Sequence, residues 1–549
     1  FTSSKRALLT PYGLGTIDQA MLGALRGRHF FLRMYGLAGK TVVLDEVHAY
    51  DVYMQTIIGT MVGWLRALGC SVVLLSATLP ARLRRQLIQA WDSDANADLE
   101  ADPAHVSYPA VWTVADGRVR LHDAVDGQPL SADRGQRATL RRHDPDLEAV
   151  AATVAQAVRD GAVVGVILNT VARAQLAFQA IKDACKADLE ADDLVLFHAR
   201  FLLRDRQRIE RAVVGHRDDD EWIAGRFGKG RRDGPAVLVA TQLAEQSLDL
   251  DVDLLVTDLA PIDLMLQRAG RLHRHDRDRP SGYAEPHVVW LCPDAPDGGL
   301  PDVTSTEVPF GFVYDPVVLW RTQRVLRALE DADGTGRWSL PDDYRRLIEA
   351  VYLADEEVTS QPPPPADLEA DAAETWTKTV EDERAKMMAS VQSAAGQTIP
   401  TSGRLAKLLR KSAPVLNDED DDSAHRTLRV ATREGDSLEV VVLHRGPDGA
   451  LYLDADLEVA APLDAEPERA LSTDAVRALL GASLRLSQTR ILGALRAADL
   501  EAWTDATENT PALRSMHALV LEDGSCSVGG YHVRFNDRLG LVLESPATS

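Results

Sequence analysis

Cysteine is scarce in this chain: the 549 residues contain four, which are widely scattered at Cys70, Cys185, Cys292 and Cys526. No two of them form a C-x-x-C pair, and no histidines cluster at the spacing of metal ligands. The sequence therefore predicts neither a disulfide framework nor a zinc site. Scattered thiols of this kind are typical of a reducing compartment, and we expect a cytoplasmic protein.

Long apolar runs are also missing. No run approaches the about 20 residues that a helix needs to cross a bilayer, and the first residues lack the pattern of a signal sequence. No membrane partner is therefore expected. Positive charge is in deficit, because 60 Lys and Arg face 83 Asp and Glu for a net charge of −23. Any nucleic-acid contact is accordingly expected in a local groove rather than over the whole surface.

Apolar, β-branched runs alternate with amphipathic stretches over the first half of the chain. Strands are expected at 41–45, 71–76, 163–168, 194–197, 236–240 and 253–257, and helices at 54–68, 147–158, 173–185 and 203–214. This alternation predicts an α/β fold with two doubly wound parallel-sheet domains, separated by the polar segment 115–146. Ligands of such sheets bind beyond the carboxyl ends of the strands.

The second half of the chain has a looser pattern. The sequence QPPPP at 361–365 and the acidic residues after it predict a stiff linker that leads into a helix. A further boundary is expected at the acidic run 417–422. Beyond it, strand patterns at 426–434, 438–445, 531–537 and 540–544 and one helix over 473–486 predict a small α+β domain.

Two carboxylates, Asp45 and Glu46, stand at the end of the first predicted strand. Adjacent acids there can divide the labour of phosphate chemistry, with one holding Mg²⁺ and the other orienting or deprotonating water. A polar turn is the simpler alternative for two acids alone. However, the next strand ends in Ser76, Ala77 and Thr78, and the order DEVH then SAT resembles motifs II and III of superfamily 2 helicases.

Two further segments resemble motifs V and VI of the same helicases: VLVATQLAEQSLDLDVD at 237–253 and QRAGRLHR at 267–274. Guanidinium groups neutralise the charge that develops on a transferred phosphoryl group, whereas a solvated arginine-rich helix is the alternative interpretation. The resemblance implies that Gln267 contacts ATP or His48. It implies catalytic roles for Asp45, Glu46, His48, Gln267, Arg271 and Arg274, a metal at Asp45, and ATP contacts from Asp45, Glu46, Asp249, Gln267, Arg268, Arg271 and Arg274.

Nucleic-acid contacts are implied at strand ends and loops, where hydroxyls, amides and backbone N–H groups of related helicases hold one strand by its sugar-phosphate. The candidates are Thr16, Gln19, Thr78, Asn169, Thr170, His198, Arg200, Thr241 and Gln242. For each of them, a turn or capping role is an equal alternative. A stripe of Arg200, Arg204, Arg208 and Arg211 suits either phosphates or solvent, and the basic loop 226–232 either binds DNA or is disordered.

A phosphate-binding loop is not recognisable. GLAGKT at 36–41 has a glycine spacing two residues short of G-x-x-x-x-G-K-[ST], and a strand rather than a helix follows it. Because the chain also starts at Phe1 rather than at a methionine, we expect a fragment whose phosphate loop lies upstream. On that basis the fragment alone is expected to be inactive.

The longer strings TPYGLGTIDQ, RHFFLRMYGLAGKTVVLDEVHAYD, LSATLP and LAEQSLDLDVDLLVTDLAPIDLMLQRAGRLHRH together resemble the CRISPR-associated helicase-nuclease of type I interference systems. The resemblance implies two RecA-like domains, the first incomplete, that use ATP and Mg²⁺ to translocate 3′ to 5′ on single-stranded DNA. It also implies recruitment by an RNA-guided surveillance complex to the displaced strand of an R-loop. It implies as well a nuclease domain with transition-metal ions, bound by histidine and aspartate, in the intact protein only. The adjacent His275 and Asp276 of this chain fall in motif VI, so they are not the residues of that nuclease.

The expected domains are the remainder of the first helicase domain at 1–125, the second helicase domain at 146–295 and its extension at 296–360. A linker with a helix at 361–416 and an accessory domain at 417–549 complete the chain. Two rival functions stay open. One is another superfamily 2 helicase for DNA or RNA, and the other is a module that binds DNA or a partner without hydrolysing ATP.

Overall fold

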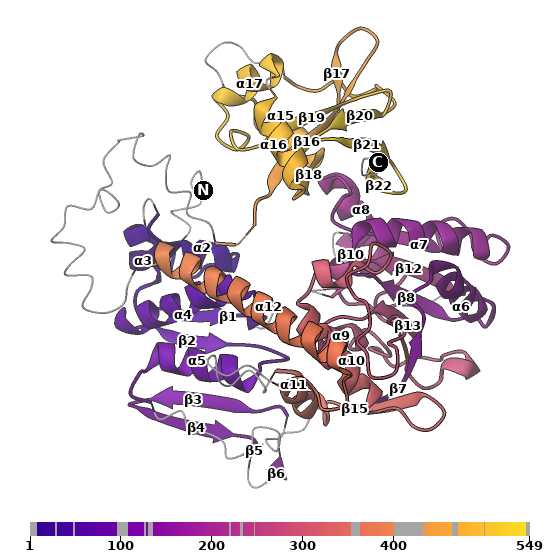
Figure 1. The fold of residues 1–549 in the computed structure, drawn as a ribbon. Helices are drawn as coiled ribbons and strands as arrows, with labels where there is room; N and C mark the ends of the chain where they lie inside the picture. The colour runs from indigo at the N-terminus through magenta and orange to yellow at the C-terminus, as the bar shows by residue number, and fades with distance from the viewer. Residues whose placement is uncertain are drawn as a thin grey trace. The chain divides into compact units, whose positions relative to one another are not determined.

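The structure is a computed structural model that describes residues 8–27, 30–47, 50–95, 108–125, 128–129, 135–218, 221–230, 234–245, 248–352, 363–399, 432–433, 435–463, 470–498 and 500–544. The chain divides into two compact units (Figure 1). The first unit contains Phe1–Gln136, Gly298–Leu300 and Ser339–Glu434, and the second contains Arg137–Asp297, Pro301–Trp338 and Gly435–Ser549. None of the described helices is long and apolar enough to cross a membrane.

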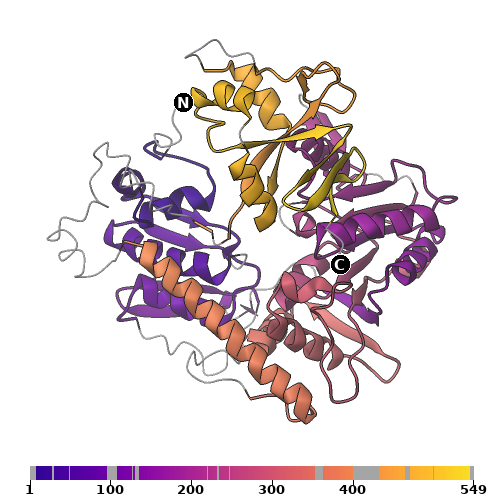
Figure 2. The ribbon, with the colours of Figure 1, turned by 45° about the horizontal axis from the view of Figure 1, so that its top comes forward.

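The first unit is built around the parallel pair β1 (Thr41–Leu44) and β2 (Ser71–Leu74), which are joined by α4 (Val52–Ala67). Asp51 starts α4 by accepting a hydrogen bond from the Met54 N–H at 2.8 Å. The apolar face of α4 forms one core with α2 (Ile17–Ala24), α3 (Phe30–Leu37) and α5 (Ala81–Trp91). The long helix α12 (Ala370–Gln397) packs along α4 in this unit (Figures 1 and 2).

A hairpin of β3 (Val111–Ala115) and β4 (Arg118–His122) also belongs to the first unit, as do β5 (Ala124–Val125), β6 (Gln128–Pro129) and α11 (Tyr344–Tyr352). The turn of the β3–β4 hairpin contains Asp116 and Gly117 at φ +50° and +72°, the conformation of tight two-residue turns. Arg84 and Arg345 lie 4.0 and 5.1 Å from the ring of Trp112, so cation–π contacts tie the hairpin to α5 and α11.

The second unit contains a seven-stranded sheet of order β15-β7-β14-β13-β8-β12-β9. Its strands are β7 (Gln136–His143), β8 (Val163–Ile167), β9 (Leu194–Phe197), β12 (Ala236–Ala240), β13 (Leu254–Asp258), β14 (His287–Leu291) and β15 (Thr335–Leu340). The pairs from β7 through β9 are parallel. Every residue of β8, β12 and β13 is buried, which explains their continuous apolar runs.

The helices of this unit are α6 (Leu147–Arg159), α7 (Val171–Ala184), α8 (Leu203–Val214), α9 (Ile262–Ala269) and α10 (Pro316–Arg327). A small antiparallel pair, β10 (Gly215–Asp218) and β11 (Glu221–Ala224), follows α8. Short 3₁₀ turns occur at Gln242–Ala244, Ser281–Tyr283 and Pro309–Phe312. The predicted α/β fold and the strands at 194–197 and 236–240 are thus confirmed.

Two parts of the predicted organisation differ in the structure. The polar segment 115–146, expected only to separate the domains, contains β7, which pairs with β14 in the second sheet. Ala138 and Leu140 of β7 are buried, whereas Arg137 stands before them and Arg141 and Arg142 stand after them. These charged neighbours hide the strand pattern in the sequence. The region expected as an extension at 296–360 is also split, because residues 298–300 and those from Ser339 group with the first unit.

Residues 435–544, here called the terminal domain, form a second mixed sheet of order β17-β16-β19-β20-β21-β22, with β18 also paired to β16. Its strands are β16 (Leu438–Arg445), β17 (Leu451–Tyr452), β18 (Ser483–Leu486), β19 (His517–Glu522), β20 (Ser525–Val528), β21 (Tyr531–Asn536) and β22 (Gly540–Glu544). Its helices are α15 (Thr473–Gly481), α16 (Thr489–Ala497) and α17 (Glu501–Glu508).

The prediction of one helix over 473–486 was wrong. The helix ends at Gly481, and Ser483–Leu486 forms β18 antiparallel to β16. The sequence SLRL alternates apolar and polar residues, and pairing with the buried β16 outweighs a helical continuation. Helices α16 and α17 were not predicted, and the strand expected at 426–434 lies largely outside the described residues.

Candidate ATP and nucleic-acid sites

The first candidate site is the carboxyl end of β1. Asp45 and Glu46 follow the strand directly, and both are exposed. The Glu46 N–H donates to Asp45 Oδ1 at 2.9 Å, and Glu46 has φ +54°, which a side chain other than glycine rarely adopts. Such backbone strain concentrates at functional sites. His48 lies outside the described residues.

The neighbouring strand end brings Thr78 into the same part of the first unit. The Leu75 N–H donates to Leu44 O at 2.9 Å and the Val47 N–H to Leu75 O at 3.1 Å, so the two strand ends stay in register beyond the strands. Thr78 is 1% exposed, and its hydroxyl has no hydrogen-bond partner among the residues that the structure describes. A buried hydroxyl without a partner is uncommon in folded proteins.

In the second unit, Arg268 of α9 is fully buried. Its Nε and Nη2 donate to Glu245 Oε1 at 2.8 and 2.6 Å, Nη1 donates to Thr257 Oγ1 at 2.7 Å, and Nη2 also donates to Asn169 Oδ1 at 3.0 Å. Burial alone would lower the pKa of Arg268, but the Glu245 carboxylate raises it above its ordinary value. Arg268 therefore ties three strand-end segments together and presents no free nitrogen to a ligand in this structure.

Arg271 and Arg274 follow α9 and differ in their surroundings. Arg271 donates to Leu248 O at 2.6 Å and also to Glu245 O, so it is anchored to the backbone of the motif V segment. Arg274 Nε lies 2.7 Å from Asp249 Oδ1, and both side chains are nearly half exposed, at 44% and 45%. The ion pair brings two candidate ATP residues, Asp249 and Arg274, into direct contact. Asp249 Oδ2 also lies 3.0 Å from His275 Nε2.

This difference predicts a difference in stability. Arg271→Ala is expected to destabilise the protein by about 1–3 kcal/mol, because two backbone carbonyls lose a charged donor. Arg274→Ala removes a surface ion pair and should change stability by less than about 1 kcal/mol. Urea unfolding followed by circular dichroism measures both, and equal losses in the two variants would contradict the assignment of Arg271 as the anchored residue.

The remaining motif residues are partly engaged in the fold. Gln267 is half-buried, and its amide nitrogen donates to none of the residues placed in the structure. Asn169 is buried and donates to Leu259 O at 2.8 Å. Thr170 caps α7 through the Arg173 N–H, and Gln242 Nε2 donates to Asn169 O at 2.8 Å. Thr241 is 3% exposed, so its side chain also faces the interior.

Two candidates of the first unit, Thr16 and Gln19, are more open than the buried candidates of the second unit. Thr16 is exposed immediately before α2, and its side chain makes no capping hydrogen bond. The Gln19 N–H donates to Thr16 O at 3.1 Å, which places the two residues on one turn. These groups fit the predicted sugar-phosphate contacts better than Thr241 or Asn169 do.

His198 and Arg200 do not present open side chains. His198 is fully buried, stacks on Phe201 at 4.5 Å, and lies with Nε2 3.0 Å from Leu539 O of the terminal domain. Its Nδ1 accepts from the Arg200 N–H at 3.1 Å. Burial lowers the pKa of His198 to about 3 and that of Arg200 to about 10. Of these two predicted DNA contacts, His198 is therefore covered by protein and Arg200 is half-buried in this structure.

The described part of the predicted basic loop is also tied to the fold. Arg226 Nε donates to Asp193 Oδ1 at 2.7 Å, and Phe227 is fully buried. Arg277 donates to the carbonyls of Gly228 and Gly230 at 3.2 and 3.1 Å. Residues 226–230 accordingly behave as a packed loop rather than as a free arm.

Comparison with known proteins decides the family. Two family signatures match, one described as "CRISPR-associated nuclease/helicase Cas3, C-terminal" over residues 160–277 and one as "Cas3 C-terminal domain" over residues 433–541. The CRISPR-associated endonuclease/helicase Cas3 of Thermus thermophilus is 35% identical over 537 residues, which cover 89% of this chain. The chain belongs to the Cas3 family. It spans about half the length of this Cas3 relative, 52%.

Solved Cas3 structures agree. The crystal structure of T. fusca Cas3-AMPPNP has a TM-score of 0.79 and 30% identity, and the match covers 98% of this chain and 58% of the T. fusca chain. A chain of the structure "CRISPR RNA-guided surveillance complex, pre-nicking" has a TM-score of 0.72 and 28% identity, with 98% of this chain and 61% of its own covered. The resemblance to the CRISPR-associated helicase-nuclease family is thus confirmed.

Sequence reasoning missed Glu245, which the structure places at the centre of the motif V and VI contacts. Its carboxylate binds Arg268 and its carbonyl accepts from Arg271. A buried carboxylate needs a cationic partner, but nothing in the sequence says that the partner lies 23 residues away on another element.

Proposed function

We propose that this chain is the motor portion of a Cas3 helicase-nuclease, which uses ATP hydrolysis to move along single-stranded DNA. The proposal rests on charged side chains at strand and helix ends in a Cas3 chain: Asp45 and Glu46 follow β1, and Arg271 and Arg274 follow α9. The similar T. fusca Cas3 structure named with AMPPNP supports a nucleoside triphosphate as the ligand. Residues 137–297 and 301–338 are here called the second helicase domain.

The proposed roles follow from the chemistry of each group. Glu46 orients or deprotonates the water that attacks the γ-phosphate, with His48 and Gln267 beside it. Arg271 and Arg274 stabilise the charge on the transferred phosphoryl group, and Asp249 holds Arg274 and the nucleotide. Arg268 is assigned to positioning α9 rather than to touching ATP, because all three of its nitrogens are bonded internally.

Asp45 would hold Mg²⁺. Magnesium in phosphate-transfer sites is bound by about one or two carboxylates while phosphates and water complete its shell. The exposed Asp45 carboxylate, whose Oδ1 accepts one backbone N–H, fits that kind of ligand. A bound Mg²⁺ would supply charge neutralisation at the phosphates.

Single-stranded DNA is the proposed track. Thr16, Gln19, Thr170 and Gln242 would hold its backbone without reading sequence. In the intact protein, we propose that recruitment by an RNA-guided surveillance complex delivers the displaced strand of an R-loop to this motor and to a metal-dependent nuclease domain. The surveillance-complex structure that contains a similar chain supports this partner.

The test is ATP hydrolysis by the intact protein with different nucleic acids. Single-stranded DNA and an R-loop that carries the surveillance complex are expected to stimulate hydrolysis, and single-stranded RNA of the same sequence is expected to do so far less. Equal stimulation by RNA and DNA, together with indifference to the R-loop, would favour another superfamily 2 helicase. Nucleic-acid binding without any stimulated hydrolysis would favour a module that does not turn over ATP.

A further inference from the structure

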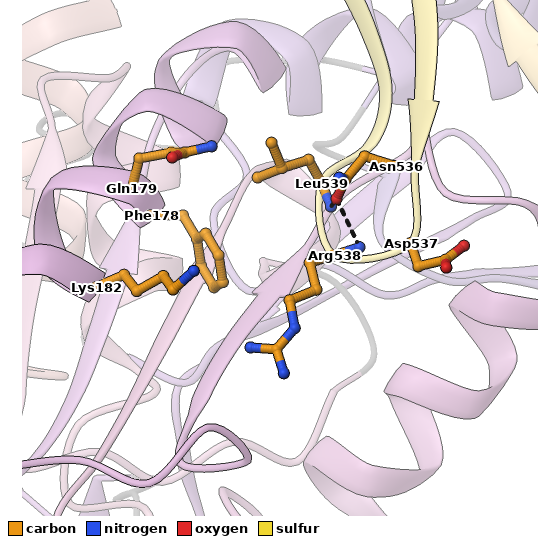
Figure 3. Close-up of a pocket in the computed structure, with 7 residues that line it drawn as sticks. All are labelled: Phe178, Gln179, Lys182, Asn536, Asp537, Arg538 and Leu539. Atoms are coloured by element: carbon orange, nitrogen blue, oxygen red, sulfur yellow. Dashed lines mark hydrogen bonds between the residues drawn. The ribbon is translucent and has the colours of Figure 1, made fainter. Parts of the chain in front are cut away.

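The turn between β21 and β22 of the terminal domain, residues Asn536–Gly540, lies against α7 and the segment that follows β9. In Figures 1 and 2 the yellow strands of the terminal domain lie beside the purple elements of the second helicase domain. Figure 3 shows Arg538 and Leu539 on the side of the turn toward Phe178 and Lys182 of α7, while the Asp537 carboxylate points away from them. The contact joins residues separated by more than 300 positions in the chain.

Three polar groups of the second helicase domain receive this turn, and two of them, the Gln175 and His198 side chains, are buried. Gln175 Nε2 donates to Leu539 O at 2.7 Å and to Leu541 O at 3.2 Å. His198 Nε2 donates to the same Leu539 O at 3.0 Å, since its Nδ1 is already an acceptor for the Arg200 N–H. In return, the Leu541 N–H donates to Arg200 O at 2.9 Å. Each of the three groups therefore has a hydrogen-bond partner in the docked turn or in Leu541, the residue that follows it.

At Gly540 the turn leaves no room for a side chain. Gly540 has φ +66°, and a Cβ there would lie 2.6 Å from Arg200 O and 3.0 Å from His198 Cε1. Both the left-handed conformation and the close approach require glycine. Docking of the turn therefore depends on a glycine at position 540.

Apolar packing supports the same contact. Leu202 of the second helicase domain is fully buried in one cluster with Leu541, Val533 and Val440 of the terminal domain. Arg204 Nη2 also donates to Leu453 O at 2.7 Å on another part of that domain. The core of the terminal domain is completed by a residue from the second helicase domain, which is typical of a permanent interface.

We propose that Gln175, His198 and Arg200 form a docking socket for the Asn536–Gly540 turn, through which the terminal domain and the second helicase domain move as one rigid body. Docking of the turn requires neither ATP hydrolysis nor DNA binding. His198 and Arg200 hold the terminal domain rather than a nucleic-acid strand. The recess of about 330 Å³ beside the turn is then the open rim of this interface.

Hydrogen exchange of the full chain tests the socket. The wild-type segments 198–204 and 536–541 are expected to exchange slowly, as interior segments do. Gly540→Val should speed exchange in both segments on the order of tenfold or more, because it places a side chain in a contact that has no room for one. Exchange within β8 and the centre of β16 should stay unchanged, which separates undocking from unfolding.

A matched control and a second variant guard against a folding defect. Gly524→Val also puts a side chain at a positive φ, +73°, but has nothing within 4 Å, so it should leave 198–204 protected. Gln175→Ala changes the socket without touching the terminal domain and should loosen the same two segments. Unchanged protection in both Gly540→Val and Gln175→Ala would overturn the socket.

The rigid-body part has its own measurement. Spin labels at Gln156→Cys on α6 and Ser527→Cys in the terminal domain, in a Cys526→Ser background, report one distance distribution. It should stay the same when AMPPNP and single-stranded DNA are added, and in Gly540→Val it should broaden. If the distance distribution of the labelled protein with Gly540 intact shifted on adding nucleotide, the rigid-body proposal would be overturned even if the motor function holds.

Discussion

Arg268→Ala is expected to destabilise the second unit by about 3–5 kcal/mol, because removing one partner of a buried ion pair leaves the other charge uncompensated. The guanidinium is fully buried and Glu245 is 4% exposed. Without Arg268, the Glu245 carboxylate, the Asn169 side-chain oxygen and the Thr257 hydroxyl would all lose a donor. Thermal and urea unfolding of the variant would measure the loss.

The control is an arginine in a weak pair. Arg159 on α6 is 48% exposed and lies 4.0 Å from Asp188, so Arg159→Ala should cost less than about 1 kcal/mol. The double variant Glu245→Leu with Arg268→Met should recover part of the loss, since apolar residues replace both charges. The loss of unfolding free energy in the double variant is compared with the sum of the losses in the single variants Glu245→Leu and Arg268→Met. If the double variant lost more than that sum, the ion pair would not be the cause.

Glu46→Gln in the intact protein is expected to lower DNA-stimulated ATP hydrolysis by about 10²- to 10⁴-fold, the usual effect of losing a general base. The amide keeps the shape of the side chain but cannot accept the proton from water. Nucleotide binding should stay close to normal, because the proposed metal ligand Asp45 and the arginines remain. Phosphate release and the binding of a fluorescent ATP analogue measure the two quantities separately.

Glu148→Gln, an exposed change in the first turn of α6, is the matched control and should hydrolyse ATP normally. Near-normal turnover in Glu46→Gln would remove Glu46 from the chemistry. Equal loss of binding and turnover would instead assign it to holding the nucleotide.

Much of the second sheet could be predicted because its strands are buried on both faces. A strand without a solvent side must be a continuous apolar run, and β8, β9 and β12 were readable for that reason. Strand β7 failed the same test, since arginines flank its two core residues. Strand β18 failed because a four-residue alternation after a helix is locally ambiguous until its partner β16 is known.

The candidate site divides in a similar way. The sequence placed Asp45, Glu46, Arg271 and Arg274 in motifs, and their catalytic roles stay predictions. It also predicted an ATP contact for Arg268 and a nucleic-acid contact for His198. In the structure, Arg268 is buried against Glu245 and His198 is buried beneath Leu539. Motif spacing reports which residues occur together but not which of them face inward.

By itself, the sequence determined the family, the α/β class and the strand ends that carry charged residues, because these follow from local periodicity and short motifs. Only the tertiary structure decided that Glu245 holds Arg268, that Gly540 seats against Arg200, and that Leu202 completes the core of the terminal domain. Those contacts join segments tens to hundreds of residues apart. Their energies depend on burial and on fixed partners, which no local pattern contains.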